Sequence, residues 1–298
     1  MSNEEFTEKI AGLVKSRLGS AEVHVHNATK NNGVHLTGIA IQEEGCNISP
    51  CIYLDGFYAK YENGDKNMEA IAGEIISAYC KNRAIHNFDV SMFTDYRRAC
   101  PMLRGRLVNT ERNAGLLKGV PHREFFDLSL TYYVEMFHPG IQEVGSILVQ
   151  DSHMQLWEVT EQELYSQTME NMAETDQASI LDMVDILGNM GGFFPCGLPE
   201  EKYPMYILTN QRKWNGAVQI LNRKALESAA VLFGSDYYIL PCSIHETILI
   251  PVGEQAGMAW DLEQAVQEVN QTAVPPEEFL SSHVYRYCAD SGHVYIAA

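Results

Sequence analysis

The sequence has no long hydrophobic run and little positive charge. No segment approaches the roughly 18 apolar residues that a membrane-spanning helix requires, and the opening segment MSNEEFTEKI is acidic where a signal peptide is basic. Lysine and arginine total 21 against 39 aspartates and glutamates, so the formal net charge is −18. We therefore expect a cytoplasmic protein that binds neither membranes nor nucleic acid, because both favour positively charged proteins.

Sequence motifs for common cofactors and metals are also missing. The seven cysteines are scattered and form no C-x-x-C pair; Cys46 and Cys51 are the nearest two, and no second pair completes a zinc site. The glycine-rich phosphate-binding motifs do not occur, and neither does H-E-x-x-H. We therefore expect no cofactor, and thiols that are reduced and mostly buried.

The proportions of hydrophobic and charged residues are those of a folded protein. Hydrophobic residues make up 46% of the chain and charged residues 20%, which is the ordinary globular mixture and excludes a disordered chain. The length of 298 residues allows two domains of about 150 residues each or one large α+β domain.

Residues 1–85 predict an N-terminal α-β-β-β-α unit. Apolar residues from Phe6 to Leu18 recur with helical spacing, and a second helical stripe runs from Met68 to Tyr79. Between them, two alternating strands at 22–26 and 34–41 flank a segment rich in turn residues. A third extended piece ends at Asp55.

Residues 86–298 predict a larger α+β body. A run of aromatic and β-branched residues at 125–137 predicts one strand buried on both faces, and Thr160 with Glu163 predicts the capping box of a helix. A stretch dense in glycine and proline near 188–204 marks a possible sub-boundary. Because helices and strands alternate irregularly, we predict the α+β class, with mixed sheets flanked by helices.

Several separated strings together resemble an uncharacterised bacterial family, a domain of unknown function about as long as this chain. They include LVN at 107–109, FDL at 126–128, DSH at 151–153 and YILPCSIHE at 238–246. Genes of that family often lie near integrative mobile elements, which implies a role in host interaction or element maintenance and no known activity. A second uncharacterised family, of Gram-positive cytoplasmic proteins, is similar in the helix at 157–171 and around Pro241.

Three histidines form the candidate metal site. His24 and His26 lie two residues apart on a predicted strand and therefore share a face, and His35 lies on the partner strand. If the register places His35 opposite His26, the three imidazoles can bind zinc, whereas a slip of one residue turns His35 to the other face. No carboxylate or cysteine completes the set, so the alternative is an exposed polar face.

Two segments carry the candidate catalytic residues. Ser243, His245 and Glu246 provide a nucleophile, a base and an acid, but they lack a glycine-flanked elbow, and the alternative is a turn whose serine binds local backbone. Asp151 and His153 follow a predicted strand and can pair across a turn or contribute to a site at the strand's end.

Asp127 and the loop after residue 208 complete the candidates. Asp127 falls inside an apolar strand, where a carboxylate needs a partner, and we expect an ion pair with Arg104, Arg106 or Arg123. Asn210 and Trp214 follow another strand and predict a ligand or partner contact, with a loop built on positive φ angles as the alternative.

Three functions remain open. We favour a non-enzymatic protein that binds another protein, with a basic partner, because an acidic surface attracts positive charge. The alternative is a small-molecule hydrolase, which requires Asp151 and His153 to meet the 243–246 segment in one pocket. Metal binding through the hairpin histidines is the third. The sequence leaves the oligomeric state open.

Overall fold

The structure, a computed structural model, describes residues 1–46, 49, 51–81, 91–136, 145–185, 204–253, 259–272 and 274–297. The chain divides into two compact units, Met1–Ser91 and Met92–Ala298. The predicted boundary after residue 85 lies outside the described residues, and so does the predicted sub-boundary near 188–204 up to residue 203. Both boundaries therefore stay predictions.

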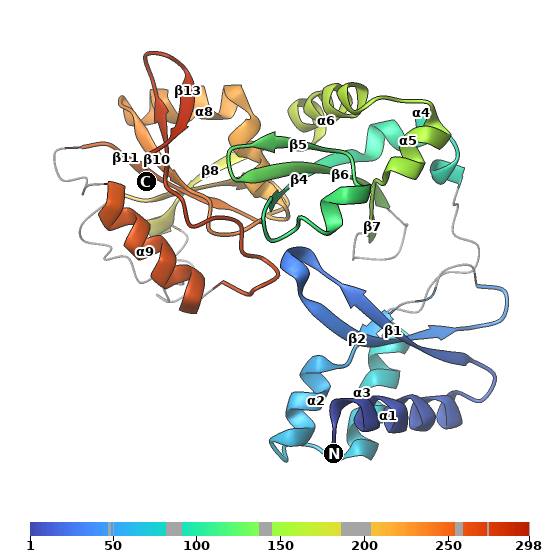
Figure 1. The fold of residues 1–298 in the computed structure, drawn as a ribbon. Helices are drawn as coiled ribbons and strands as arrows, with labels where there is room; N and C mark the ends of the chain where they lie inside the picture. Colours follow the sequence, from blue (N-terminus) through green and yellow to red (C-terminus); the bar gives the residue numbers. More distant parts are fainter. Residues whose placement is uncertain are drawn as a thin grey trace. The chain divides into compact units, whose positions relative to one another are not determined.

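The first unit is a three-stranded antiparallel sheet with its helices on one face (Figure 1). Its order begins α-β-β-β as predicted, but Asp55 begins an additional helix instead of only ending the third strand. The elements are α1 (Asn3–Leu18), β1 (Glu22–Thr29), the 3-10 helix η1 (Asn31–Gly33), β2 (His35–Gln42), β3 (Cys51–Tyr53), α2 (Asp55–Glu62) and α3 (Met68–Lys81).

The core of this unit lies between the helices and β2. Phe6 and Ile10 of α1, Ile71 and Ile75 of α3, and Ile39 of β2 are completely buried and belong to one apolar cluster. These are the stripes that the helical spacing predicts, so local periodicity and the position of the core agree here.

The second unit combines two antiparallel sheets. The four-stranded sheet has the order β4-β6-β5, with β7 also paired to β6, and the six-stranded sheet has the order β13-β12-β10-β11-β9-β8. Its elements are η2 (Ser91–Phe93), α4 (Tyr96–Ala99), η3 (Cys100–Met102), β4 (Leu103–Asn109), η4 (Leu116–Gly119), β5 (His122–Phe125), β6 (Leu128–Met136), β7 (Gly145–Leu148), α5 (Asp151–Trp157), α6 (Glu161–Thr175), β8 (Ala178–Asp182), β9 (Tyr206–Asn210), η5 (Gly216–Leu221), α8 (Arg223–Phe233), β10 (Tyr237–Leu240), β11 (Thr247–Pro251), α9 (Ala259–Thr272), β12 (Tyr285–Cys288) and β13 (His293–Ile296).

Strand β10 is buried on both faces and separates two apolar clusters. Tyr237 and Ile239 belong to the large cluster that includes α6, α8 and the four-stranded sheet, whereas Tyr238 and Leu240 belong to the cluster under α9. Figure 1 accordingly shows α8 and α9 on opposite sides of the six-stranded sheet. The α+β class predicted from the sequence is confirmed.

Two local predictions in this unit are wrong. The run at 125–137 is not one strand, because β5 ends at Phe125 and β6 begins at Leu128, with Phe126 in the left-handed region at φ 56°. Asp151 and His153 do not lie on a turn after the preceding strand, because Asp151 begins helix α5. The first break is hard to predict, because Phe126 and Asp127 occupy turn positions that glycine or asparagine usually fill.

The structure also tests the expectations that the thiols are mostly buried and that no helix spans a membrane. The described cysteines are free thiols, but Cys242 alone among them is buried, so the prediction of mostly buried thiols is wrong for this part of the chain. Within the described ranges, no helix has both the length and the apolar character needed to cross a membrane.

Candidate functional site

One face of the four-stranded sheet is charged although it is buried. Strands β4 and β6 pair with Arg104 opposite Tyr133 and Arg106 opposite Thr131, so these side chains and that of Glu135 share a face. The opposite face carries Leu107 and other apolar residues that pack against α6. A buried charge needs a partner, so the contacts of this polar face decide what it does.

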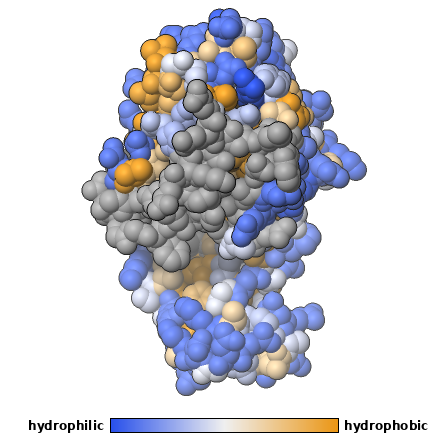
Figure 2. All heavy atoms as spheres, turned by 90° about the vertical axis from the view of Figure 1, so that its left-hand side faces the viewer, coloured by the Kyte–Doolittle hydropathy of each residue, from blue (hydrophilic) through white to orange (hydrophobic). Residues whose placement is uncertain are grey.

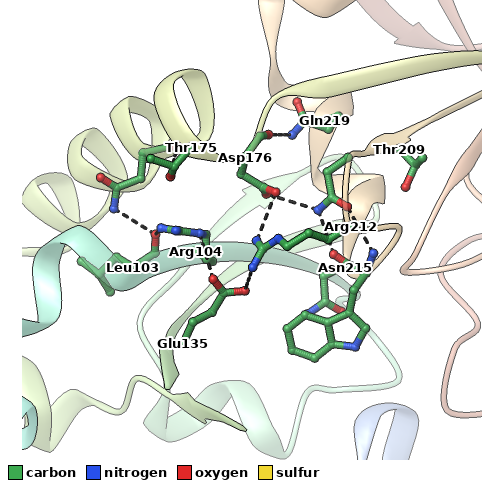
Figure 3. Close-up of polar contacts among 12 residues, drawn as sticks. Leu103, Arg104, Glu135, Thr175, Asp176, Thr209, Arg212, Asn215 and Gln219 are labelled. Carbon is green, nitrogen blue, oxygen red and sulfur yellow. Dashed lines mark hydrogen bonds and ion pairs between the residues drawn. The ribbon is translucent and has the colours of Figure 1, made fainter. Parts of the chain in front are cut away.

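Glu135 is the centre of a network that Figure 3 shows in close-up. Its side chain is completely buried and lies between two arginines: Arg104 Nε is 3.2 Å from Oε2, and Arg212 Nη1 donates to Oε1. Arg212 also reaches Asp176, with Nη2 3.1 Å from Oδ1. We call Arg104, Glu135, Asp176 and Arg212 the Glu135 network.

The charges of this network balance one another. Burial raises the pKa of Glu135, and the positive charges of Arg212 and Arg104 oppose that rise. Burial lowers the pKa of Arg212, but the carboxylates of Glu135 and Asp176 raise it, and the increase prevails. The network therefore closes on itself and holds two sheets together, because Arg212 follows β9 whereas Glu135 lies on β6.

Asn210 is buried inside this arrangement. Its amide nitrogen donates to the carbonyl of Trp214 at 2.8 Å and to Asp176 Oδ2 at 3.3 Å, and its side-chain oxygen accepts the Trp214 N–H at 3.1 Å. Trp214 is partly exposed, and its ring meets the ring of Tyr133 edge to face at 5.5 Å. Asn210 thus shapes the loop from within, and contact with a ligand or partner stays a prediction for both residues.

The same loop depends on close backbone approach. Lys213 and Asn215 have positive φ angles of 54° and 52°, and a Cβ atom on Gly216 would lie 2.2 Å from Thr209 Oγ1 and 2.7 Å from the His245 carbonyl oxygen. Only glycine fits at position 216. The loop is thereby pressed against the turn that carries His245.

His245 is held between the loop and the segment before β12. Its Nδ1 accepts the backbone N–H of Asn215 at 3.0 Å, so the proton of the neutral ring is on Nε2, which lies 3.6 Å from Glu278 Oε1. Burial lowers the pKa of His245; the Glu278 carboxylate opposes this effect and the Arg106 charge adds to it. The imidazole is therefore neutral near pH 7.

Ser243 and Glu246 do not complete a catalytic set around His245. Ser243 Oγ accepts the backbone N–H of His245 at 3.1 Å, and among the described residues no hydrogen bond joins this hydroxyl to the imidazole. Burial raises the pKa of Glu246, and Lys213 opposes the shift. The serine therefore stabilises its own turn, as in the turn alternative that the sequence leaves open.

Asp151 and His153 lie elsewhere, on the first turn of α5. His153 Nδ1 accepts the N–H of Gln150 at 3.0 Å, and its ring stacks on Trp157 at 5.5 Å. Burial lowers the pKa of His153. In the described part of the chain, no hydrogen bond, ion pair or ring contact links these two residues to the 243–246 turn.

The hairpin histidines do not converge. His26 pairs with Gly38 and His35 pairs with Thr29, so of the two registers that the sequence left open the structure has the one that places His35 on the face opposite His24 and His26. His24 contacts Glu22, and His35 bonds to Thr29 at 3.1 Å. Over the residues that the structure describes, no group of three metal-ligating side chains occurs.

Asp127 has partners other than the expected arginines. Ser281 Oγ donates to Oδ2 at 2.7 Å and the Tyr285 hydroxyl donates to Oδ1, so the predicted ion pair is wrong. A cavity of about 450 Å³ lies beside this turn, and Arg112 stacks over Phe279 in its wall at 3.7 Å. The sequence singled out Asp127 because it is a charge in an apolar run, and the same criterion applied to Glu135 would have found the network.

The comparisons with known proteins define a family and no activity. A family model described as a family of unknown function (DUF5688) matches residues 3–289. Because the match spans almost the whole chain, the protein belongs to this family, and the predicted membership of a family of unknown function is confirmed. Searches of the curated proteins and of the solved structures find no significant match.

Proposed function

We propose that the chain is a non-enzymatic binding protein whose partner is a basic protein. One observation carries this proposal: the candidate catalytic groups already maintain local structure in two separate places. His153 binds the start of α5, His245 binds the backbone of Asn215, and Ser243 binds its own turn. A general base needs a free nitrogen near its nucleophile, and these assignments support a structural use instead.

The surface charge supports a basic partner. The chain has a surplus of 18 negative charges, and most of the coloured residues on the face drawn in Figure 2 are hydrophilic. Helix α6 contains four glutamates and no lysine or arginine, and Glu170 and Glu174 are exposed near its C-terminal end. Carboxylates are unfavourable at that end of a helix, so we assign the contact with the partner to this stripe of α6.

The cellular setting belongs to the same proposal. A cytoplasmic protein of a bacterial mobile element that acts on a host factor agrees with the resemblance noted from the sequence. The hydrolase alternative has one observation in its favour, the approach of Glu278 to His245 at 3.6 Å. A hydrolase built on His245 and Glu278 would not need Asp151 or His153.

The experiment compares two matched charge reversals of the full chain. Glu170→Lys/Glu174→Lys alters the α6 stripe, and Glu4→Lys/Glu8→Lys makes the same change at the same spacing on exposed positions of α1. Each immobilised protein is exposed to a bacterial lysate at about 50 mM and about 300 mM salt, since screening weakens contacts between exposed charges. Retained proteins are identified by mass spectrometry.

The proposal requires a defined pattern of retention. A basic protein should bind the wild type and the α1 variant at low salt, and should be lost from the α6 variant and at high salt. Equal retention by both variants contradicts the assignment to α6. Turnover of a panel of simple esters, amides or phosphates that disappears in His245→Asn would overturn the non-enzymatic function.

A further inference from the structure

The cavity beside Asp127 is built from three segments that are far apart in the sequence. It has a volume of about 450 Å³ and is lined by residues at 109–112 at the end of β4, at 126–127 between β5 and β6, and within 279–283 before β12. Cavities that bind small molecules have volumes of about 300–1,000 Å³ and combine apolar walls with a few polar groups. The lining therefore indicates which kind of molecule this cavity can hold.

Asp127 presents a negative charge to the cavity. Ser281 Oγ donates to its Oδ2 atom at 2.7 Å and the Tyr285 hydroxyl donates to its Oδ1 atom, so both of these donors are neutral. Within the described ranges, no lysine, arginine or histidine forms an ion pair with this carboxylate. A carboxylate has about four acceptor positions, and Asp127 is partly exposed, so a positively charged ligand group can occupy the positions that remain.

Arg112 presents a positive charge to the same cavity. Its guanidinium carbon lies 3.7 Å from the centre of the Phe279 ring, so the guanidinium stacks on that ring. In the part of the chain that the structure describes, the Arg112 side chain forms no ion pair or hydrogen bond. Stacking leaves the N–H groups at the edge of the guanidinium free to donate, and their fork fits the two oxygens of a carboxylate.

Phe126 adds an apolar wall next to Asp127. Its ring is 45% exposed, and its centroid lies 4.7 Å from that of Phe125 and 5.3 Å from that of Tyr285. The φ angle of 56° at Phe126 is costly for a bulky residue, and such conformations are concentrated at binding and active sites. The exposed ring can cover the apolar part of a ligand whose charged group contacts Asp127.

We propose that this cavity binds an α-amino acid with an apolar side chain. The ammonium group pairs with Asp127, the carboxylate pairs with Arg112, and the side chain packs on Phe126. Glu111 also lines the cavity, so two carboxylates face one guanidinium among these residues, which disfavours a ligand that carries only negative charge. The site is separate from the acidic stripe on α6, and either proposal can fail without the other.

Three probes that share one ring separate the two charges of the ligand. Phenylalanine carries both charges at pH 7, phenethylamine lacks the carboxylate, and 3-phenylpropionate lacks the ammonium group. Each probe is titrated into the full chain by calorimetry at constant ionic strength, so that screening does not vary. We expect phenylalanine to bind one to one and at least about 10-fold more tightly than either analogue, because each analogue loses hydrogen bonds between charged groups.

Two variants assign each charge of the ligand to one residue. Asp127→Asn should weaken the binding of phenylalanine and phenethylamine by at least about 10-fold and leave that of 3-phenylpropionate unchanged or tighter. Arg112→Gln should weaken the binding of phenylalanine and 3-phenylpropionate and spare that of phenethylamine. Arg97→Gln, at an exposed position of α4, is the matched control and should bind like the wild type. Because Arg112 is exposed, its variant tests the site even if Asp127→Asn does not fold.

The outcomes that overturn the proposal are distinct. Failure of both phenylalanine and leucine to saturate the protein at about 20 mM, or an unchanged affinity for phenylalanine in Arg112→Gln, rejects the site. Equal affinities for phenylalanine and phenethylamine mean that the ligand is a simple amine and that the assignment to amino acids is wrong. Equal affinities for phenylalanine and 3-phenylpropionate contradict the role of Asp127.

Discussion

Arg212 joins its own loop, after β9 of the six-stranded sheet, to Glu135 near the end of β6 in the four-stranded sheet. The two residues are 77 positions apart in the chain. Glu135 is completely buried, whereas the Arg212 side chain is 30% exposed. The ion pair therefore connects the two sheets, and Arg212 is its solvent-exposed member.

Removing Arg212 should destabilise the protein strongly. Arg212→Met leaves the buried carboxylates of Glu135 and Asp176 short of a positive partner, and we expect the free energy of unfolding to fall by about 3 kcal/mol. Urea unfolding followed by fluorescence measures the change. Arg223→Met breaks an exposed pair with Glu227 and should cost about 0.5 kcal/mol or less. Equal losses in the two variants would contradict the connecting role of Arg212.

Gly216 should tolerate no side chain. In Gly216→Ala the new Cβ would lie 2.2 Å from Thr209 Oγ1 and 2.6 Å from the backbone nitrogen of Asn210, so the loop must move. We expect a loss of about 3 kcal/mol in the free energy of unfolding. Gly115→Ala is the matched control, because nothing lies within 4 Å of its Cβ position; it should be neutral or slightly stabilising. A mild effect at Gly216 would mean that the loop is free to shift.

Features that depend on local sequence patterns were predicted well. In the first unit, the apolar stripes of α1 and α3 follow from the spacing of residues within one helix. In the second unit, the capping box of Thr160 and Glu163 is present at the start of α6. Each of these features depends on residues a few positions apart. The helix that begins at Asp55 escaped prediction because its short amphipathic stretch follows directly on β3.

The candidate site could be predicted only in fragments. His245, Asn210 and Trp214 were singled out from the sequence, and Arg106 was named only as a possible partner of Asp127. Glu135 and Glu278 became visible only when register and long-range contacts were known. The pairing of Arg106 with Thr131 fixes which side chains share a face, and a one-residue slip would reverse it. Sequence periodicity carries no information on the loop from β9 that covers this face.

The stability of the protein should depend on the protonation of His245. Burial holds the pKa of this imidazole below its ordinary value of 6.5, so the unfolded chain takes up the proton first as the pH falls. The stabilising contribution is complete above pH 6.5 and decreases as the pH drops toward the folded pKa. Protonation would also break the bond from the Asn215 N–H to Nδ1.

Unfolding by urea between about pH 5 and pH 8 tests this dependence. His245→Asn keeps an oxygen that can accept the Asn215 N–H but cannot titrate, so its free energy of unfolding should fall less than that of the wild type below pH 6.5. Burial also lowers the pKa of His153, and His153→Asn removes that second contribution. Identical pH profiles for the wild type and His245→Asn would show that His245 titrates normally.

The hydroxyl of Tyr285 should be worth more than that of an exposed tyrosine. Tyr285 is completely buried, its hydroxyl donates to Asp127, and Ser281 is the second donor to that carboxylate at 2.7 Å. Burial and the Asp127 charge raise the pKa of Tyr285, so the phenol stays protonated and remains a donor. Tyr285→Phe leaves Asp127 with one of these donors and should lower the free energy of unfolding by about 2 kcal/mol.

Tyr295→Phe is the matched control for this change, since Tyr295 is 43% exposed and its hydroxyl should contribute less than about 0.5 kcal/mol. Ser281→Ala removes the other donor and tests whether the two hydroxyls act together. If they do, the double variant loses more than the sum of the single ones, because Asp127 is then left without either donor. Losses in Tyr285→Phe no larger than in Tyr295→Phe would mean that water replaces the phenol from the cavity beside Asp127.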